Sequence, residues 1–277
     1  MGLLQGATEL FPVSSLGHAV LVPSLFHWSF KQSDPTFVPF LTLLHIGTAT
    51  ALLIFYGDQW IAIIRGFFTA AFSGRMRNDD ERLAMLLLVG TIPAAILGVL
   101  FENRIKGLFT SPYEAAAFLV VNGILLLGFE QLRRRAERGG TRAEQEEQFA
   151  SAERISFRAA AIVGACQALA FIPGLSRSGV TIGGGLIAGL RHQEAARFSF
   201  LLATPTILGA GVVEVPQLFT GGVPVGEYVL AAVLSGIAAY ISARYLIRYF
   251  RSGRLDPYGF YCITAGLVSL ALLRFGL

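Results

Sequence analysis

The sequence predicts an all-α polytopic membrane protein, and three features of the chain support that prediction. Hydrophobic residues make up 54% of the 277 residues and charged residues only 14%, with a mean hydropathy of +0.61, whereas a soluble domain carries about a quarter charged residues. Apolar stretches long enough to cross a bilayer recur along the chain. Arginines gather at the ends of these stretches. The net charge of +4 therefore indicates membrane topology, and no nucleic-acid partner is expected.

Six stretches reach the length of about 20 mostly apolar residues that a membrane-spanning helix needs. They cover 36–57, 84–101, 115–132, 198–219, 228–247 and 257–275. Two further regions, 1–26 and 156–190, are apolar but interrupted by Pro, Gly, Ser and ionisable residues. Proline would break a continuous helix there, and an isolated charge is costly at bilayer depth. We therefore expect both regions to form re-entrant hairpins, which enter and leave the membrane on one side.

The distribution of Lys and Arg between the spans predicts the orientation of the chain. Arginines gather after the first span, within 133–155 and after 228–247, whereas 102–114 has two basic residues and 220–227 has none. This alternation fits the positive-inside rule only if 156–190 does not cross the membrane. The first hairpin then enters from the outer side and the second from the cytoplasm.

The predicted order of elements suggests an internal repeat. A hairpin followed by three spans occurs twice, and because three is odd, the second copy is inverted relative to the first. We expect a single membrane domain over 1–277, with a first repeat at 1–132, a charged cytoplasmic linker at 133–155 and a second repeat at 156–277.

The first hairpin carries a cluster of polar side chains suited to nucleophilic chemistry. The cluster consists of Gln5, Glu9, Pro12, Ser14, Ser15 and His18. Gln5 and Glu9 share one helical face at a spacing of four, and Pro12 suits the turn between the arms. A carboxylate, a hydroxyl and an imidazole supply a nucleophile with acid and base assistance. A helix cap and an interfacial histidine are the structural alternative, but they leave a membrane-embedded Glu unexplained.

The second hairpin carries a motif suited to binding an anion. It contains Pro173, Gly174, Leu175, Ser176, Arg177, Ser178, Gly179 and Thr181. Glycines allow close backbone approach, and N–H groups at a helix start attract negative charge. Arg177 offers two parallel donors to phosphate oxygens. A packing hairpin is the structural alternative, but an Arg in such a run has few structural uses in lipid.

Several other polar residues are more ordinary. We expect His45, inside the first span, to have a hydrogen-bonded packing role, with a supporting role at the site as the alternative. Glu194 and Arg197 are spaced to form an ion pair near the interface. Glu214 lies near the outer end of its span, where it can be solvated.

These motifs resemble those of the undecaprenyl-diphosphate phosphatase family, also known as bacitracin-resistance proteins. The likeness covers almost the whole chain. It includes Gln5-x-x-x-Glu9, Pro12-Val-Ser-Ser-x-Gly-His18 and Pro173-Gly-x-Ser-Arg-Ser-x-x-Thr181, with a further stretch at Leu44-His-Ile-Gly-Thr48. One difference is at the start: family members carry an apolar segment before the first motif, whereas Gln5 stands near the first residue here.

The resemblance implies hydrolysis of undecaprenyl diphosphate to the monophosphate, which recycles the lipid carrier of peptidoglycan synthesis. It also implies a multi-pass protein of the bacterial inner membrane, a homodimer, a site open to the outer side, and a divalent cation, Mg²⁺ or Ca²⁺. On this basis Glu9, Ser15, His18 and Arg177 are the expected catalytic residues. Glu9 is also the expected metal ligand.

The remaining polar residues of the two motifs are expected to bind the substrate. They are Gln5, Ser14, Gly174, Ser176, Ser178 and Thr181. The nucleophile stays open between Ser15, His18 and water. A transporter that flips a lipid phosphate through the same cavity is the alternative function, since inverted repeats and broken helices also build transporters.

Overall fold

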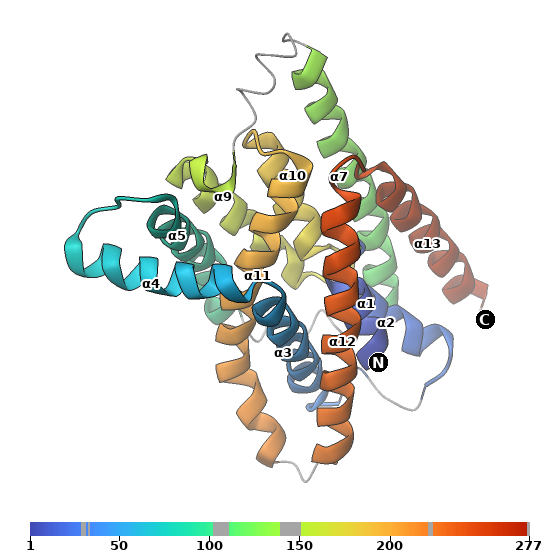
Figure 1. The fold of residues 1–277 in the computed structure, drawn as a ribbon. Helices are drawn as coiled ribbons and strands as arrows, with labels where there is room; N and C mark the ends of the chain where they lie inside the picture. Colours follow the sequence, from blue (N-terminus) through green and yellow to red (C-terminus); the bar gives the residue numbers. More distant parts are fainter. Residues whose placement is uncertain (29–31, 33, 102–110, 139–150, 221–223, 276–277) are drawn as a thin grey trace.

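The computed structural model describes residues 1–28, 32, 34–101, 111–138, 151–220 and 224–275 (Figure 1). Within these ranges the chain is helical apart from turns and short connections, and no strand occurs. The predicted loop segment 102–110 and most of the predicted linker, 139–150, lie outside the described residues.

Six helices of the described part are long and apolar enough to cross a membrane. They are α3 (Phe37–Phe55), α5 (Asp79–Leu100), α7 (Pro112–Arg138), α11 (His192–Glu214), α12 (Val225–Tyr249) and α13 (Asp256–Phe275). Each overlaps one predicted span, so a helix of sufficient length and apolar content is confirmed at every predicted span. A short 3₁₀ helix, η3 (Val215–Thr220), continues α11.

The two interrupted regions are pairs of short helices. The first pair is α1 (Gly2–Glu9) and α2 (Ser15–Leu25); the second is α9 (Phe157–Gln167), extended by η2 (Ala168–Phe171), and α10 (Arg177–Ile187). Serine side chains start three of these helices by accepting a backbone N–H, as Ser14 does for α2 and Ser176 for α10. The polar motifs therefore lie at the turns within the two pairs.

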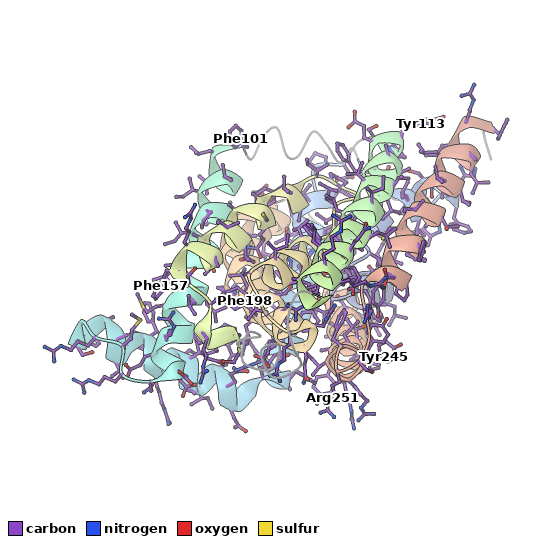
Figure 2. The ribbon with its side chains drawn as sticks, turned by 90° about the horizontal axis from the view of Figure 1, so that it is seen from above. Phe101, Tyr113, Phe157, Phe198, Tyr245 and Arg251 are labelled. Carbon is purple, nitrogen blue, oxygen red and sulfur yellow. The ribbon has the colours of Figure 1, made fainter. Side chains whose placement is uncertain are left out.

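One helix was missed by the sequence analysis, which placed its residues in a loop. Helix α4 (Gly57–Ser73) follows α3 directly and packs on α5 through Ile63, Gly66 and Ala70. It is amphipathic rather than uniformly apolar, so a search for spans did not find it. Figures 1 and 2 show that α4 lies across the direction of α12.

Helix α5 begins earlier than the predicted span because its acidic first turn is capped. The Asn78 side chain accepts the N–H of Glu81 (2.9 Å), and the Glu81 carboxylate accepts the N–H of Arg77 (2.6 Å). This reciprocal arrangement starts the helix at Asp79. The acidic run at 79–81 is therefore a helix start and not a solvated loop.

The two halves of the chain share one core. Helix α12 packs on α1 and α3, α9 packs on α5, and α7 packs on α10 and α13. Glycines allow several of these crossings. A Cβ on Gly6 would lie 2.0 Å from the carbonyl oxygen of Ser235, and one on Gly164 would lie 1.9 Å from that of Gly90. The high glycine content thus serves close helix packing.

The expected ion pair of Glu194 and Arg197 is present, at 3.0 Å, and belongs to a larger cluster. Arg197 also pairs with Glu153 at 2.8 Å. Arg82 donates to the backbone oxygens of Glu153 and Ile155 at 2.6 and 2.9 Å. The residues before α9 are thereby tied to α5 and α11.

Candidate active site

The two polar motifs lie against each other, and Ser14 joins their turns. The Ser14 hydroxyl donates to the carbonyl oxygen of Leu175 (3.0 Å) and accepts the N–H of Gly174 (3.2 Å). Gly174 has a φ of +104°, and a Cβ there would lie 2.3 Å from the carbonyl oxygen of Ala115 on α7. Glycine is required at this position by both conformation and space. Ser14 and Gly174 therefore shape the turns, and neither lines the cavity described below.

A second joint comes from α7. The fully buried Asn122 amide donates to the carbonyl oxygen of Pro12 (3.0 Å) and accepts the N–H of Ser176 (2.9 Å). The Ser178 hydroxyl donates to the carbonyl oxygen of Phe11 (2.9 Å). Asn122 was not singled out from the sequence. A lone Asn in an apolar span gives no sign of partners that lie 54 and 110 residues away.

Glu9 is the centre of the polar cluster. Its carboxylate is 4% exposed. Oε1 pairs with Nη2 of Arg177 at 2.6 Å. Oε2 accepts hydrogen bonds from the Ser15 hydroxyl and from the Gln5 amide, the latter at 2.8 Å. One buried carboxylate thus holds the candidate nucleophile and the candidate phosphate ligand together.

His45 belongs to this cluster, so its contacts favour the alternative of a supporting role at the site over a role in packing alone. Its Nε2 lies 3.0 Å from Oε2 of Glu9 and 3.0 Å from Nε2 of Gln5. Its Nδ1 is hydrogen-bonded to the carbonyl oxygen of Leu41 (2.7 Å), which fixes the ring on α3. The sequence did not favour this role because His45 lies far along the chain from both motifs. The one feature that could have indicated it is an imidazole inside an apolar span.

Two donor and acceptor atoms of the cluster have no hydrogen-bond partner among the described residues. They are Nη1 of Arg177 and Oε1 of Gln5, and both are buried. Burial without a partner is costly, so such atoms suit an absent ligand. A guanidinium N–H fits a phosphate oxygen, and an amide oxygen beside a carboxylate fits a hard cation.

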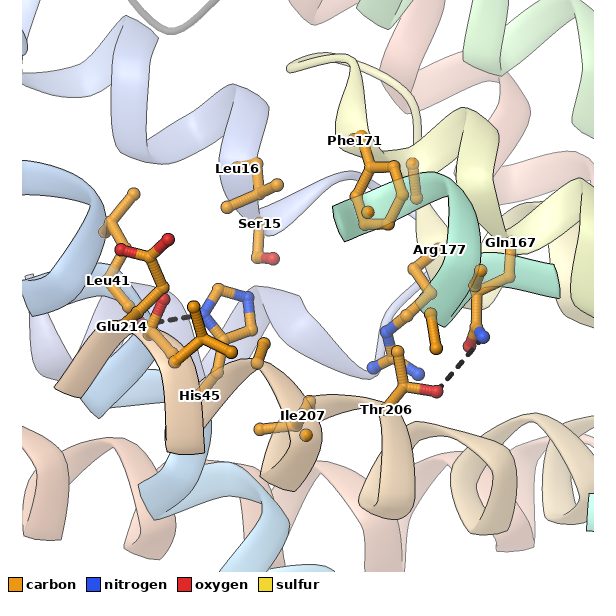
Figure 3. A pocket seen from close by; sticks show the side chains of 18 of the residues that line it. Ser15, Leu16, Leu41, His45, Gln167, Phe171, Arg177, Thr206, Ile207 and Glu214 are labelled. Atoms are coloured by element: carbon orange, nitrogen blue, oxygen red, sulfur yellow. Dashed lines mark hydrogen bonds between the residues drawn. The ribbon is translucent and has the colours of Figure 1, made fainter. Parts of the chain in front are cut away.

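A cavity of about 370 Å³ opens beside this cluster (Figure 3). Its polar end is formed by Glu9, Ser15, His45, Ser176 and Arg177. The rest is mostly apolar and is lined by side chains of α3, α5, η2 and α11. Glu214 also lines it and is buried, so the expected solvated position is wrong. A headgroup site thus lies next to an apolar space.

Four other predicted residues lie outside the lining of the cavity: Gln5, which donates to Glu9 as described, His18, Ser178 and Thr181. His18 is hydrogen-bonded through Nδ1 to the carbonyl oxygen of Ser14 (2.8 Å) and through Nε2 to the Tyr261 hydroxyl (2.7 Å). The Thr181 hydroxyl donates to the carbonyl oxygen of Arg177 (2.7 Å), and Ser178 binds the first turn as described. Their contacts support the walls of the site.

The arrangement has the parts needed for phosphoryl transfer. A hydroxyl is hydrogen-bonded to a carboxylate that can take its proton, and a guanidinium with an unused donor lies on the other side of that carboxylate. Ser176 starts α10, whose N-terminal dipole favours an anion at the same place. No three His, Cys, Asp or Glu side chains of the described ranges form a metal-binding group on their own.

Comparison with known proteins identifies the family of this chain. Curated relatives from Acidiphilium cryptum and Mycolicibacterium paratuberculosis, both named undecaprenyl-diphosphatase, are 46% identical to this chain; the matches cover 99% of it and 96% and 95% of the relatives. Undecaprenyl-diphosphatase 2 of Burkholderia thailandensis is 47% identical, over 99% of this chain and 95% of its own length. The family model described as bacitracin resistance protein BacA matches residues 1–268. The chain therefore belongs to the bacitracin resistance protein BacA family of multi-pass membrane proteins.

Proposed function

We propose that this protein is an integral membrane phosphatase that hydrolyses undecaprenyl diphosphate to undecaprenyl phosphate and inorganic phosphate. At 46% identity over nearly the full chain, it is an enzyme of the undecaprenyl-diphosphatase type. The observation that carries the proposal is the contact of Glu9 with both Ser15 and Arg177 at the polar end of an apolar cavity. This geometry suits a charged headgroup on a hydrocarbon tail.

The diphosphate is held by Arg177 and by the start of α10. Nη1 of Arg177, which has no partner among the described residues, binds a phosphate oxygen, and Ser176 lines the cavity beside it. Charge that develops on the phosphoryl oxygens is stabilised by the guanidinium in a site shielded from bulk water.

The Ser15 oxygen is placed as the nucleophile. It attacks the terminal phosphorus while Glu9 takes its proton, the anhydride P–O bond breaks, and the lipid monophosphate leaves. Water then attacks the phosphoserine. Glu9 returns the proton to the departing Ser15 oxygen, and water supplies the oxygen and hydrogen atoms of the released phosphate.

Two other nucleophiles remain as alternatives to Ser15. Water activated by Glu9 is one, with Ser15 then serving only to bind the phosphate. His18 is the other, but both of its ring nitrogens are engaged by Ser14 and Tyr261. The hydrogen bond from the Ser15 hydroxyl to the Glu9 carboxylate favours Ser15.

A divalent cation, Mg²⁺ or Ca²⁺, fits the oxygen ligands present. Glu9, the unpartnered Oε1 of Gln5 and the Ser15 hydroxyl would hold it together with substrate phosphates, as Mg²⁺ sites commonly do. When bound, the cation would neutralise charge on the diphosphate. Gln5 keeps its amide oxygen beside the carboxylate for that purpose.

The finer membrane arrangement is also part of the proposal. The two short-helix pairs are re-entrant hairpins of an inverted repeat, the protein is a homodimer in the bacterial inner membrane, and the site opens to the outer side. Support comes from the arginine distribution and from the two broken-helix regions that meet at the site. In this position the enzyme recycles the lipid carrier used in peptidoglycan synthesis.

The direct test is phosphate release from undecaprenyl diphosphate by purified protein, with and without a chelator. We expect Ser15→Ala, Glu9→Gln and Arg177→Lys each to lose about a hundredfold or more in kcat/KM. Arg177→Lys keeps the charge but loses the parallel donors. Chelation should abolish wild-type activity, with recovery on addition of Mg²⁺ or Ca²⁺.

Arg251→Ala is the matched control, since Arg251 is exposed and far along the chain from both motifs. It should leave the rate unchanged. Wild-type activity in Arg177→Lys would contradict the phosphate-binding role, and lipid translocation without phosphate release would contradict the hydrolase.

A further inference from the structure

We propose that the isoprenoid tail of the substrate leaves the active site sideways between α5 and α11, and that Gly209 controls the passage. This inference rests on the proposed function and adds the route of the tail and a residue that selects for chain bulk. It starts from the apolar part of the cavity, which extends away from Glu9 and Arg177.

The cavity reaches the outside of the helix bundle between these two helices. Ala95 and Val99 of α5 line the cavity and are exposed, Val99 at 71%. Gly209 and Ala210 of α11 line it as well and are exposed. All four positions lie within predicted spans, so what they face is hydrocarbon. The four residues at this opening are therefore apolar and small or medium in size, which suits the passage of a hydrocarbon chain from the cavity into lipid.

Proline and small residues keep this gap open. Pro93 lies inside α5 and Pro205 inside α11, and because proline has no N–H, each leaves one helical backbone hydrogen bond unmade. Pro205 itself lines the cavity. Close to the opening, a Cβ on Gly98 would lie 3.2 Å from the ring of Phe171. The Phe171 ring therefore fills the space beside Gly98, and the passage does not run there.

Gly209 is different because no packing contact requires it. A Cβ there would meet nothing within 4 Å, whereas one on Gly211 would lie 2.6 Å from Ile46. A glycine inside a helix costs about 1 kcal/mol relative to alanine. Glycine at 209 thus lowers the stability of the helix, although no close contact in the folded chain requires a residue without a side chain. Gly128 has the same open surroundings, but only Gly209 lines the cavity at its opening, so space for a passing chain accounts for the glycine at 209.

The size of the cavity requires such an exit. A volume of about 370 Å³ is near the lower end of cavities that enclose a drug-sized ligand. The headgroup and the first isoprene units fill it, so the remainder of an undecaprenyl chain must continue into the bilayer. The opening near the end of α5 and the end of α11 keeps that chain within one leaflet.

The test compares substrates of different tail length in the same phospholipid vesicles. We expect Gly209→Phe to lower kcat/KM for undecaprenyl diphosphate by at least about tenfold. Hydrolysis of a short, water-soluble isoprenyl diphosphate should stay within about twofold of wild type, because its tail does not need the exit. Gly209→Ala should retain both activities.

Gly128→Phe is the matched control. Gly128 lies on the long helix α7, a Cβ there also meets nothing within 4 Å, and it does not line the cavity. This variant should hydrolyse both substrates at wild-type rates. A monodisperse elution profile in detergent and an unchanged thermal midpoint show that Gly209→Phe is folded.

The outcomes separate the two proposals. If wild type hydrolyses neither diphosphate, the proposed function fails. If Gly209→Phe loses both activities equally, or keeps full activity on the long substrate, the proposed function stands and the exit at Gly209 is wrong. A loss confined to the long substrate supports the exit.

Discussion

Among single residues, Glu9 has partners from both motifs and from α3, whereas the sequence around it predicts only the nearby Gln5 as a partner. It binds Arg177, Ser15 and Gln5, and His45 lies within 3.0 Å. A buried carboxylate needs such partners, since removing one leaves an uncompensated polar group. The environment that stabilises Glu9 is therefore also the environment that orients the hydroxyl and the guanidinium.

The contacts of the two histidines predict different effects of their removal. We expect His45→Ala to lower kcat for undecaprenyl diphosphate by about tenfold or more, because Glu9 loses a partner that fixes its orientation. His18→Ala should mainly lower stability, by about 1–3 kcal/mol, because this buried histidine loses its hydrogen bonds to the Tyr261 hydroxyl and to the carbonyl oxygen of Ser14.

Steady-state kinetics and thermal unfolding in detergent, measured on both variants, distinguish these effects. A variant Tyr261→Phe keeps the ring and removes only the hydroxyl, so it should reproduce part of the stability loss of His18→Ala with kcat intact. A collapse of kcat in His18→Ala at unchanged stability would instead favour the catalytic role expected for His18 from the sequence.

How far the sequence reveals the site depends on the kind of signal each residue gives. Glu9 and Arg177 were predictable because an ionised side chain in an apolar region is energetically costly and therefore usually has a function. His45 and Asn122 were not, because each acts through partners at least 36 residues away. Placing an uncharged polar residue in a span costs much less free energy than placing an ionised one there, so such a residue does not by itself indicate a site.

At the scale of elements, glycines decide where helices can touch. Gly90 and Gly164 form the crossing of α5 and α9, where backbone faces backbone. This crossing matters for the site because α9 leads into the turn that carries Arg177. Close packing of small residues replaces the hydrophobic driving force that lipid does not provide.

The glycine crossing predicts opposite effects for two alanine substitutions. Gly164→Ala should destabilise the protein by about 1–3 kcal/mol or more, because its Cβ would lie 1.9 Å from the Gly90 oxygen and the helices must separate. Gly128→Ala should be neutral or stabilise by about 0.5–1 kcal/mol, since its Cβ meets open space. Thermal unfolding in one detergent compares the two; equal shifts would show that the crossing does not limit stability.

The six long helices were predicted from the sequence and α4 was not, and the difference has a physical reason. The six long helices follow from length and apolar content, which the bilayer imposes on any span. Helix α4 is instead amphipathic. Ile63, Gly66 and Ala70 face α5, while Arg65 faces outward. Its pattern is that of a helix on a surface, which a search for spans overlooks.

At the scale of the whole molecule, the two halves meet at one site. Glu9 comes from the first short-helix pair and Arg177 from the second, and Asn122 of α7 binds both turns. Such a meeting requires both pairs to reach the same depth. The proposed re-entrant pairs, entering from opposite sides, would achieve this while keeping the irregular backbone buried in protein.

Cysteine labelling in intact cells tests this arrangement. After Cys166→Ser and Cys262→Ala remove the native thiols, single cysteines replace the exposed Arg154, before α9, and Arg191, after α10. If 156–190 is re-entrant, both positions lie in the cytoplasm, and an impermeant maleimide should label them only after permeabilisation. Gly226→Cys, at the other end of α12 from the arginines, should be labelled from outside without permeabilisation.

The decisive comparison is between the two ends of the pair α9 and α10. A continuous crossing would place residues 154 and 191 on opposite sides, and one of them would then be labelled in intact cells. That result would reverse the orientation of every later helix and contradict the inverted repeat. Labelling of both ends only after permeabilisation, together with outside labelling at 226, requires an even number of crossings through 156–190 and so supports entry of Arg177 from the cytoplasmic side.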